Sequence, residues 1–178
     1  MLMSALLTAG GPNLIVEFPN EPVTGADMQW DFVNIDRGTF FRLFIQAKLL
    51  DGSGSNWQQY RYKQLLRKSG GKLQAITLCD TARSESAAYP LYAFYHPERC
   101  CMAANMAGAQ NVEGVNLASG YLVEALIIAA TTFVRKSTCK RFATMQPNFF
   151  SLRDLFCPPS LRPAPPLAYR ARASVPSF

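Results

Sequence analysis

The chain has 178 residues, of which 49% are hydrophobic and 17% charged, and its formal net charge is +6. This length suits a single domain with a proper core better than two domains. The charge is uneven: no Lys or Arg precedes Arg37, whereas from Arg135 onward eight basic residues accompany one acid, Asp154. A metal-dependent enzyme that acts on a polyanion would need an acidic cluster and a basic half. A basic tail without a specific partner explains the pattern equally well.

Cysteine and hydropathy patterns exclude several other classes. The five cysteines are odd in number and lack CxxC spacing, and with one histidine, His96, they argue against a structural zinc site. Free thiols fit a reducing cytosol. Residues 1–7 form an apolar run that is too short for a signal peptide, and they lack its basic region. We therefore predict a cytoplasmic protein without a membrane span.

Three segments are predicted along the chain. Residues 1–13 form a short apolar stub, residues 14–150 a folded domain, and residues 151–178 a Pro-rich basic tail that is extended or disordered. The domain opens with a strand over Asn13–Phe18, which Pro19 stops. Pro22 and Gly25 predict an irregular segment after it.

The stretch from Thr24 to Leu49 predicts a hairpin of two strands, Ala26–Val33 and Thr39–Leu49. Alternate side chains point to opposite faces. Placing Asp31 opposite Arg42 matches apolar with apolar residues on one face and also makes a carboxylate–guanidinium pair. The predicted apolar pairs are Phe32 with Phe41, Trp30 with Leu43, and Met28 with Ile45. The one poor match is Phe44 against Gln29 on the outer face.

This register gathers Asp27, Gln46 and Lys48 on the polar face. Such a group costs solvation unless something uses it, and a divalent cation that bridges to a phosphate fits best. Because the Lys48 ammonium is expected to face Asp27 and its side chain to add no core volume, truncating it should leave the fold nearly intact.

The same residues carry a resemblance to a known family. Gly25-Ala26-Asp27, followed one strand later by Gln46-Ala47-Lys48, resembles the core of the PD-(D/E)xK nuclease superfamily, in the Gln-x-Lys branch of Mrr-type restriction enzymes. The wider string Glu21-x-x-Thr24-Gly-Ala-Asp27-x-x-Trp30, with Gln46-Ala-Lys48 and Tyr89–Tyr95, is similar to a bacterial family with this core. The resemblance covers residues 14–96. It implies an α/β fold with a restriction-endonuclease-like core, in which a central mixed sheet with a β-hairpin is flanked by helices.

The resemblance also implies a site. Asp27 would bind Mg²⁺ or Mn²⁺, Gln46 and the Ala47 carbonyl would add weaker oxygen ligands, and Lys48 would activate or orient water. Because an amide at Gln46 leaves the site one negative charge poorer, another carboxylate should help. Glu21 is the first choice for its spacing to Asp27. Glu17 is the second, and each is equally well explained as a surface acid. The glutamate-bearing helix that usually precedes the first strand has almost no room in the stub.

Residues Trp57–Lys68 interleave aromatic and basic side chains. Such a segment can stack on bases and neutralise phosphates, or its rings can pack on the core. The candidate nucleic-acid-binding residues are Trp57, Tyr60, Arg61, Lys63, Arg67 and Lys68.

The later part of the domain predicts a helix over Leu73–Ala82, a strand over Tyr89–Tyr95 and a helix over Asn116–Val134 that Asn116 caps. Ile76, Cys79 and Ala82 are expected on the inner side of the first helix. His96 is available to a site, but a lone histidine beside a proline is more often structural.

The resemblance implies a Mg²⁺-dependent nuclease that hydrolyses phosphodiester bonds of DNA or RNA, in restriction or phage defence. One alternative is an inactive relative that only binds nucleic acid, a protein partner or a second copy. Another is an unrelated α/β domain in which Asp27 and Lys48 form a structural ion pair.

Overall fold

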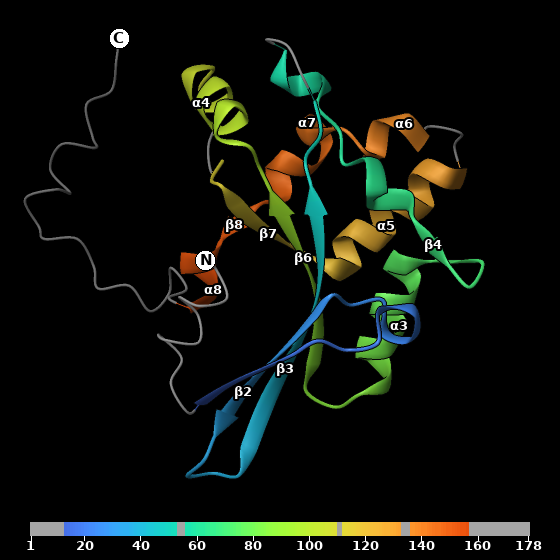
Figure 1. The fold of residues 1–178 in the computed structure, drawn as a ribbon, viewed down its shortest axis with the longest axis vertical. Helices are drawn as coiled ribbons and strands as arrows, with labels where there is room; N and C mark the ends of the chain where they lie inside the picture. Colours follow the sequence, from blue (N-terminus) through green and yellow to red (C-terminus); the bar gives the residue numbers. More distant parts are fainter. Residues whose placement is uncertain (1–12, 53–55, 110–111, 133–135, 157–178) are drawn as a thin grey trace, which may run out of the picture.

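The computed structural model describes residues 13–52, 56–109, 112–132 and 136–156. A six-stranded sheet is its centre (Figure 1). The strands, in spatial order, are β1 (Leu14–Glu17), β2 (Met28–Asn34), β3 (Thr39–Leu49), β6 (Ala88–Tyr95), β7 (Val115–Ser119) and β8 (Phe150–Ser151). A separate ribbon pairs β4 (Lys68–Ser69) with β5 (Lys72–Leu73).

Helices surround the sheet. They are α2 (Glu21–Thr24), α3 (Gln74–Ser84), α4 (Glu98–Met106), α5 (Gly120–Thr132), α6 (Lys136–Cys139), α7 (Phe142–Met145) and α8 (Leu152–Phe156). Three 3-10 turns complete the described elements: η2 (Trp57–Gln59), η3 (Lys63–Leu66) and η4 (Gln146–Asn148).

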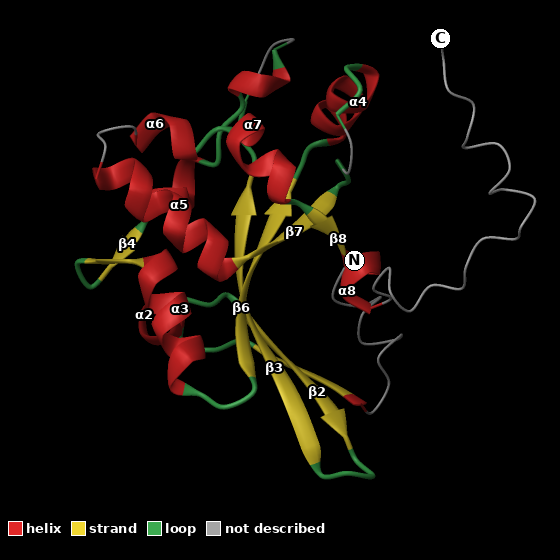
Figure 2. Cartoon of the chain, turned by 180° about the vertical axis from the view of Figure 1, so that it is seen from behind, coloured by secondary structure: helices red, strands yellow, loops and turns green. Residues whose placement is uncertain are grey.

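The sheet is mixed. β1, β2 and β3 form an antiparallel meander, α3 then returns the chain so that β6 runs parallel to β3, and β7 and β8 are again antiparallel (Figure 2). A parallel neighbour requires a crossover connection of this kind, which α3 provides. The protein is therefore of the α/β class, and its central mixed sheet with a hairpin and flanking helices is compatible with the expected restriction-endonuclease-like core.

The predicted register of the hairpin is confirmed. Asp31 lies opposite Arg42, and the guanidinium donates to both carboxylate oxygens, at 2.7 and 3.0 Å. Met28, Trp30 and Phe32 face Ile45, Leu43 and Phe41 as expected. Matched apolar pairs on one face fix the register, because a slip of one residue would move them all to the other face.

Both faces of the sheet are buried, which the sequence pattern did not predict. One face carries Met28, Trp30 and Ile45 and is packed by residues of α8. The other carries Phe44 and Tyr92 beneath α3, α5 and α7. The outer face of the hairpin is thus a core face, and Phe44, which faces Gln29, is an inward residue with 1% exposure.

Three elements near the N-terminal half bear on the site. The first strand is shorter than predicted and covers Leu14–Glu17. The segment expected to be irregular contains α2, because Pro22 is tolerated in the first turn of a helix and Gly25 ends it in the left-handed conformation. The predictions for α3 and β6 are confirmed within two residues at each end.

The predicted helix over Asn116–Val134 is wrong in its first part. Residues Val115–Ser119 form β7, and the helix begins at Gly120. The apolar residues that suggested one helix belong to two separate hydrophobic clusters. Leu117 packs in the cluster on the α8 side of the sheet, whereas Val123 packs in the cluster on the α3 side. Pairing with β6 outweighs the local helical pattern.

The domain also extends further than predicted. β8 pairs with β7, and Leu152 and Leu155 of α8 pack against the sheet, so the tail boundary expected at residue 151 lies too early. The Pro-rich part, residues 157–178, and the stub at residues 1–12 lie outside the described residues. Within the described part, no helix combines the length and apolar character needed to cross a membrane.

Candidate active site

The site lies where β2 begins beside the end of β3. Asp27 immediately precedes β2, and its N–H donates to the Ile45 carbonyl at 2.9 Å. Its carboxylate Oδ2 accepts the Ala47 N–H at 2.7 Å and also a hydrogen bond from Gln46 Nε2. Asp27 is therefore fixed on β3 by its main chain and its side chain together.

Two further oxygen atoms belong to this corner. Gln46 is 1% exposed, and its Oε1 has no hydrogen-bond partner among the described residues. The N–H and C=O of one strand residue point to the same edge, so the Ala47 carbonyl faces the Asp27 side, as its N–H does. The corner thus presents a carboxylate and a backbone carbonyl, and the Gln46 amide turns its N–H rather than its oxygen toward Asp27.

Lys48 lies on the same face as Gln46 but is buried, with 4% exposure, and its Nζ donates to Gln74 Oε1 at 3.1 Å. Burial lowers the pKa of Lys48, and the negative charges of Asp27 and Glu21 oppose that change. The ion pairs of the described residues do not include one between Lys48 and Asp27. The expectation that the Lys48 side chain adds no core volume is wrong.

Glu21 joins the group through α3. Its Oε1 accepts a hydrogen bond from Gln74 Nε2, and Arg67 Nη1 lies 3.6 Å from the same oxygen. Burial raises the pKa of Asp27, and the charge of Glu21 raises it further. Glu17, the second choice, instead accepts from Gln29 Nε2 at 3.2 Å on the neighbouring strand.

Gly25 allows this arrangement. It has φ of +72°, and a Cβ built on it would lie 2.6 Å from the Leu78 nitrogen and 2.9 Å from the Gln74 carbonyl oxygen. Only glycine permits α2 to approach the backbone of α3 so closely. The close approach brings Glu21 to Gln74, and Gln74 in turn to Lys48.

Gln74 is the site residue that the sequence analysis did not identify. It begins α3 and is buried on the stripe that Leu78 and Ala82 continue at helical spacing. A polar residue on this otherwise apolar stripe was the signal that could have identified it. The expected inner side of the helix was also partly misplaced, because Ile76 is only half-buried.

The donor set fits a hard cation. Mg²⁺ and Mn²⁺ prefer carboxylate, amide and carbonyl oxygens, and Mg²⁺ keeps several waters. Asp27, Gln46 and Ala47 supply such oxygens, and Glu21 adds a second carboxylate nearby. Among the described residues no group of three or more His, Cys, Asp or Glu side chains could hold a metal ion.

In the segment Trp57–Lys68 the aromatic rings and the cations lie in different environments. Tyr60 is 4% exposed within the core, and Trp57 is half-buried with its ring edge against Phe142, at a centroid distance of 5.2 Å. These contacts favour the packing interpretation for both rings. The four cations, by contrast, are exposed: Arg61, Lys63, Arg67 and Lys68.

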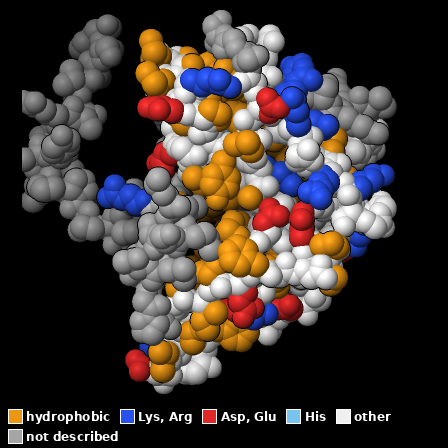
Figure 3. Space-filling model, viewed as in Figure 1, with side chains coloured by type: hydrophobic (Ala, Val, Ile, Leu, Met, Phe, Trp, Pro, Cys, Tyr) orange, Lys and Arg blue, Asp and Glu red, His pale blue; other side chains and the backbone are white. Residues whose placement is uncertain are grey.

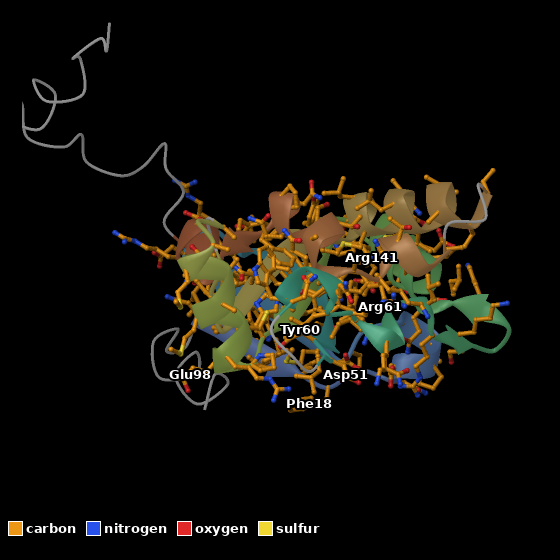
Figure 4. The ribbon with its side chains drawn as sticks, turned by 90° about the horizontal axis from the view of Figure 1, so that it is seen from above. Phe18, Asp51, Tyr60, Arg61, Glu98 and Arg141 are labelled. Carbon is orange, nitrogen blue, oxygen red and sulfur yellow. The ribbon has the colours of Figure 1, made fainter. Side chains whose placement is uncertain are left out.

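The exposed cations lie close to other charged groups. Backbone bridges join Asp51 to Arg61 and Arg61 to Arg141, and the three residues form a row in Figure 4. Lys63 pairs with Asp51, and Arg67 contacts Glu21 of the site. Figure 3 shows Lys and Arg side chains gathered at the upper right of one face, beside acidic side chains.

His96 has a structural role. Its Nδ1 lies 2.7 Å from the Glu113 carbonyl oxygen, which can only accept, so Nδ1 carries the proton and Nε2 accepts from the Tyr62 hydroxyl at 2.7 Å. Burial lowers the pKa of His96, which keeps the ring neutral.

The fold and the site define a class: an α/β protein with a central mixed sheet, compatible with a restriction-endonuclease-like core, whose hairpin brings an aspartate to a Gln-x-Lys strand. The chain belongs to the family of unknown function DUF6615, whose model matches residues 1–177. No curated protein matches the chain.

Proposed function

We propose that this protein is a Mg²⁺- or Mn²⁺-dependent nuclease of the PD-(D/E)xK type that hydrolyses phosphodiester bonds of DNA or RNA. The observation that carries the proposal is the corner at the end of β3. There Asp27 and the Ala47 carbonyl present oxygen atoms near Lys48, and a third oxygen, Gln46 Oε1 of the amide that donates to Asp27, is buried without a partner among the described residues. An unpartnered buried acceptor is costly unless a ligand uses it.

Each residue has a distinct task in this proposal. Asp27 would hold the cation with one full charge, and Gln46 and Ala47 would complete the protein's share of its ligands. When bound, the cation polarises the scissile phosphate and stabilises the charge that develops on it. Lys48, whose Nζ is held by Gln74, has further N–H donors with which to orient the attacking water or the phosphate. Glu21 adds negative charge that offsets the missing carboxylate at position 46.

The substrate would be a polyanion that approaches over the exposed cations. Arg67 contacts Glu21, so the basic segment begins at the site itself. Arg61 and Arg141 continue it along the row of Figure 4. Phosphates bound there would lead the strand to the corner of β3. A cytoplasmic place in restriction or phage defence accords with this chemistry.

The test is incubation with plasmid, linear and single-stranded DNA and with RNA, each with Mg²⁺, Mn²⁺ or EDTA. The proposal predicts cleavage that EDTA stops and that Asp27→Asn abolishes. Asp31→Asn is the control, because Asp31 lies on β2, the strand that Asp27 precedes, and its carboxylate is bound by Arg42. Cleavage that survives Asp27→Asn would contradict the proposal.

A second candidate is an inactive relative that binds nucleic acid or a protein partner, including a second copy. The amide at Gln46 favours it, and so does the fact that Asp27 Oδ2 already accepts two N–H groups. Tight DNA binding in EDTA, without cleavage in any metal, would establish this function instead.

A further inference from the structure

A chain of hydrogen bonds joins the partly exposed Glu21 to the buried Lys48. Glu21 Oε1 accepts from Gln74 Nε2, and Gln74 Oε1 accepts from Lys48 Nζ at 3.1 Å. Gln74 is 1% exposed and Lys48 4%, whereas the Glu21 side chain is 29% exposed. The backbone N–H of Gln74 also donates to the Arg67 carbonyl at 3.0 Å. The Gln74 amide is therefore held between an anion and a cation, on a backbone that is itself fixed.

Only one orientation of the Gln74 amide satisfies both of its neighbours. A side-chain amide accepts through its oxygen and donates through its nitrogen. If the amide turned over, its N–H groups would face the donors of Lys48 and its oxygen would face the Glu21 carboxylate. An ionised carboxylate can only accept, so Glu21 determines which end of the amide points to Lys48.

Glu21 is less suited than Asp27 to bind the metal. Arg67 Nη1 lies 3.6 Å from the Glu21 oxygen that Gln74 already occupies, so a cation at this carboxylate would meet the charge of the guanidinium. Asp27, by contrast, accepts from neutral amide N–H groups. The ion pairs of the described residues do not include Asp27. The two carboxylates thus have different surroundings, which favour different tasks.

We propose that Glu21 and Gln74 are positioning residues: Glu21 orients the Gln74 amide, and the amide oxygen holds Lys48 Nζ in place for the reaction. The inference rests on the proposed function and leaves the cation to the oxygen ligands named there. Neither Glu21 nor Gln74 touches metal or substrate in this role. The feature of Glu21 that serves Lys48 is then an accepting oxygen, which glutamine at position 21 keeps and leucine removes.

The decisive comparison is Glu21→Gln with Glu21→Leu, because both remove the charge and only the first keeps an acceptor for Gln74. Metal-dependent cleavage should retain most of its kcat in Glu21→Gln and lose about 100-fold in Glu21→Leu, as expected for a misplaced reacting group, with the same KM in both. Titration calorimetry with Mn²⁺ should give one affinity for the two variants. Glu85→Leu is the matched control, since Glu85 is a partly exposed acid paired with Arg42, and it should keep the wild-type kcat.

Two further measurements test the route through Gln74. Gln74→Met keeps an unbranched stem without the amide, so Glu21→Gln and Glu21→Leu should have equal kcat in that background. The ¹³C NMR signal of Lys48 Cε, recorded in EDTA and assigned by its absence in Lys48→Met, reports the surroundings of the side chain without any reaction. It should stay near its wild-type shift in Glu21→Gln and move in Glu21→Leu.

The possible failures are distinguishable. If the two Glu21 variants have equal kcat in the wild-type background, the inference is wrong while the proposed function stands. If they differ in Mn²⁺ affinity, Glu21 is a ligand of the metal and the inference is wrong as well. If the wild-type protein shows no metal-dependent cleavage, the proposed function fails, and the role of Glu21 and Gln74 fails with it.

Discussion

Truncating Lys48 tests both the burial of its stem and the use of its ammonium. Lys48→Ala removes about three buried methylene groups, each worth about 0.8 kcal/mol, and so costs about 2.4 kcal/mol before any cavity is counted. A cavity that does not collapse adds to this cost. Lys48→Met keeps nearly the same stem volume. Both variants lose the ammonium, and both leave Gln74 Oε1 without its donor.

The comparison of the two variants therefore isolates packing. Losses common to both cancel, and the alanine variant should be less stable than the methionine variant by about 2–4 kcal/mol. For a domain of this size each kcal/mol corresponds to about 2–4 °C, so the melting temperatures should differ by about 5–15 °C. Differential scanning calorimetry or circular dichroism measures this directly.

Activity separates function from packing. The Met variant should lose metal-dependent cleavage by about a hundredfold or more, since a positioned acid–base group is typically worth that much. A folded Met variant that cleaves at the wild-type rate would refute the role of Lys48. Melting temperatures of the two variants within about 2 °C would refute the burial argument, because 4% exposure implies a packed stem.

Three further predictions concern other parts of the site. Gly25→Ala should melt well below Gly38→Ala, because both have positive φ but only at Gly25 would the new Cβ meet backbone, at 2.6 Å. Asp27→Asn should melt above wild type at pH 7, because the raised pKa of Asp27 means that its charged form costs stability at that pH. The gain in melting temperature should shrink as the pH falls toward 3.8, and a gain independent of pH would contradict the burial of a charged carboxylate as its cause. In DNA binding without metal, Arg61→Gln should lower affinity and reduce the slope against log salt by about one, whereas Arg83→Gln, whose side chain pairs with Glu124, should change neither.

The hairpin could be predicted from the sequence because its register depends only on residues of two strands that are adjacent in the chain. Alternation fixed which residues share a face, and the pairing of Asp31 with Arg42 fixed the register. The contact of Asp27 with Gln46 followed from the same register. These features need only two neighbouring strands, whose side-chain period is two.

The remaining features depend on contacts between distant segments. Gln74 meets Lys48 only because α3 packs across β3, and a glutamine at the start of a helix does not reveal its partner. β7 was mistaken for the start of a helix because pairing with β6 is a tertiary contact. Burial of the polar face likewise depended on α3 and α5, which cover residues far from them in sequence.

The structure also bears on the alternative in which Asp27 and Lys48 form a structural ion pair. A structural ion pair stabilises both charged forms, so it lowers the pKa of the acid and raises that of the base. Arg42 shows this behaviour, since its hydrogen bond to Asp31 raises its pKa. For Asp27 and Lys48 burial outweighs their mutual attraction: the pKa of the acid is raised and that of the base is lowered, and Lys48 is held by Gln74. Burial therefore disfavours both charged forms in the folded protein, and the ion pairs of the described residues include none between Asp27 and Lys48 that would offset that cost.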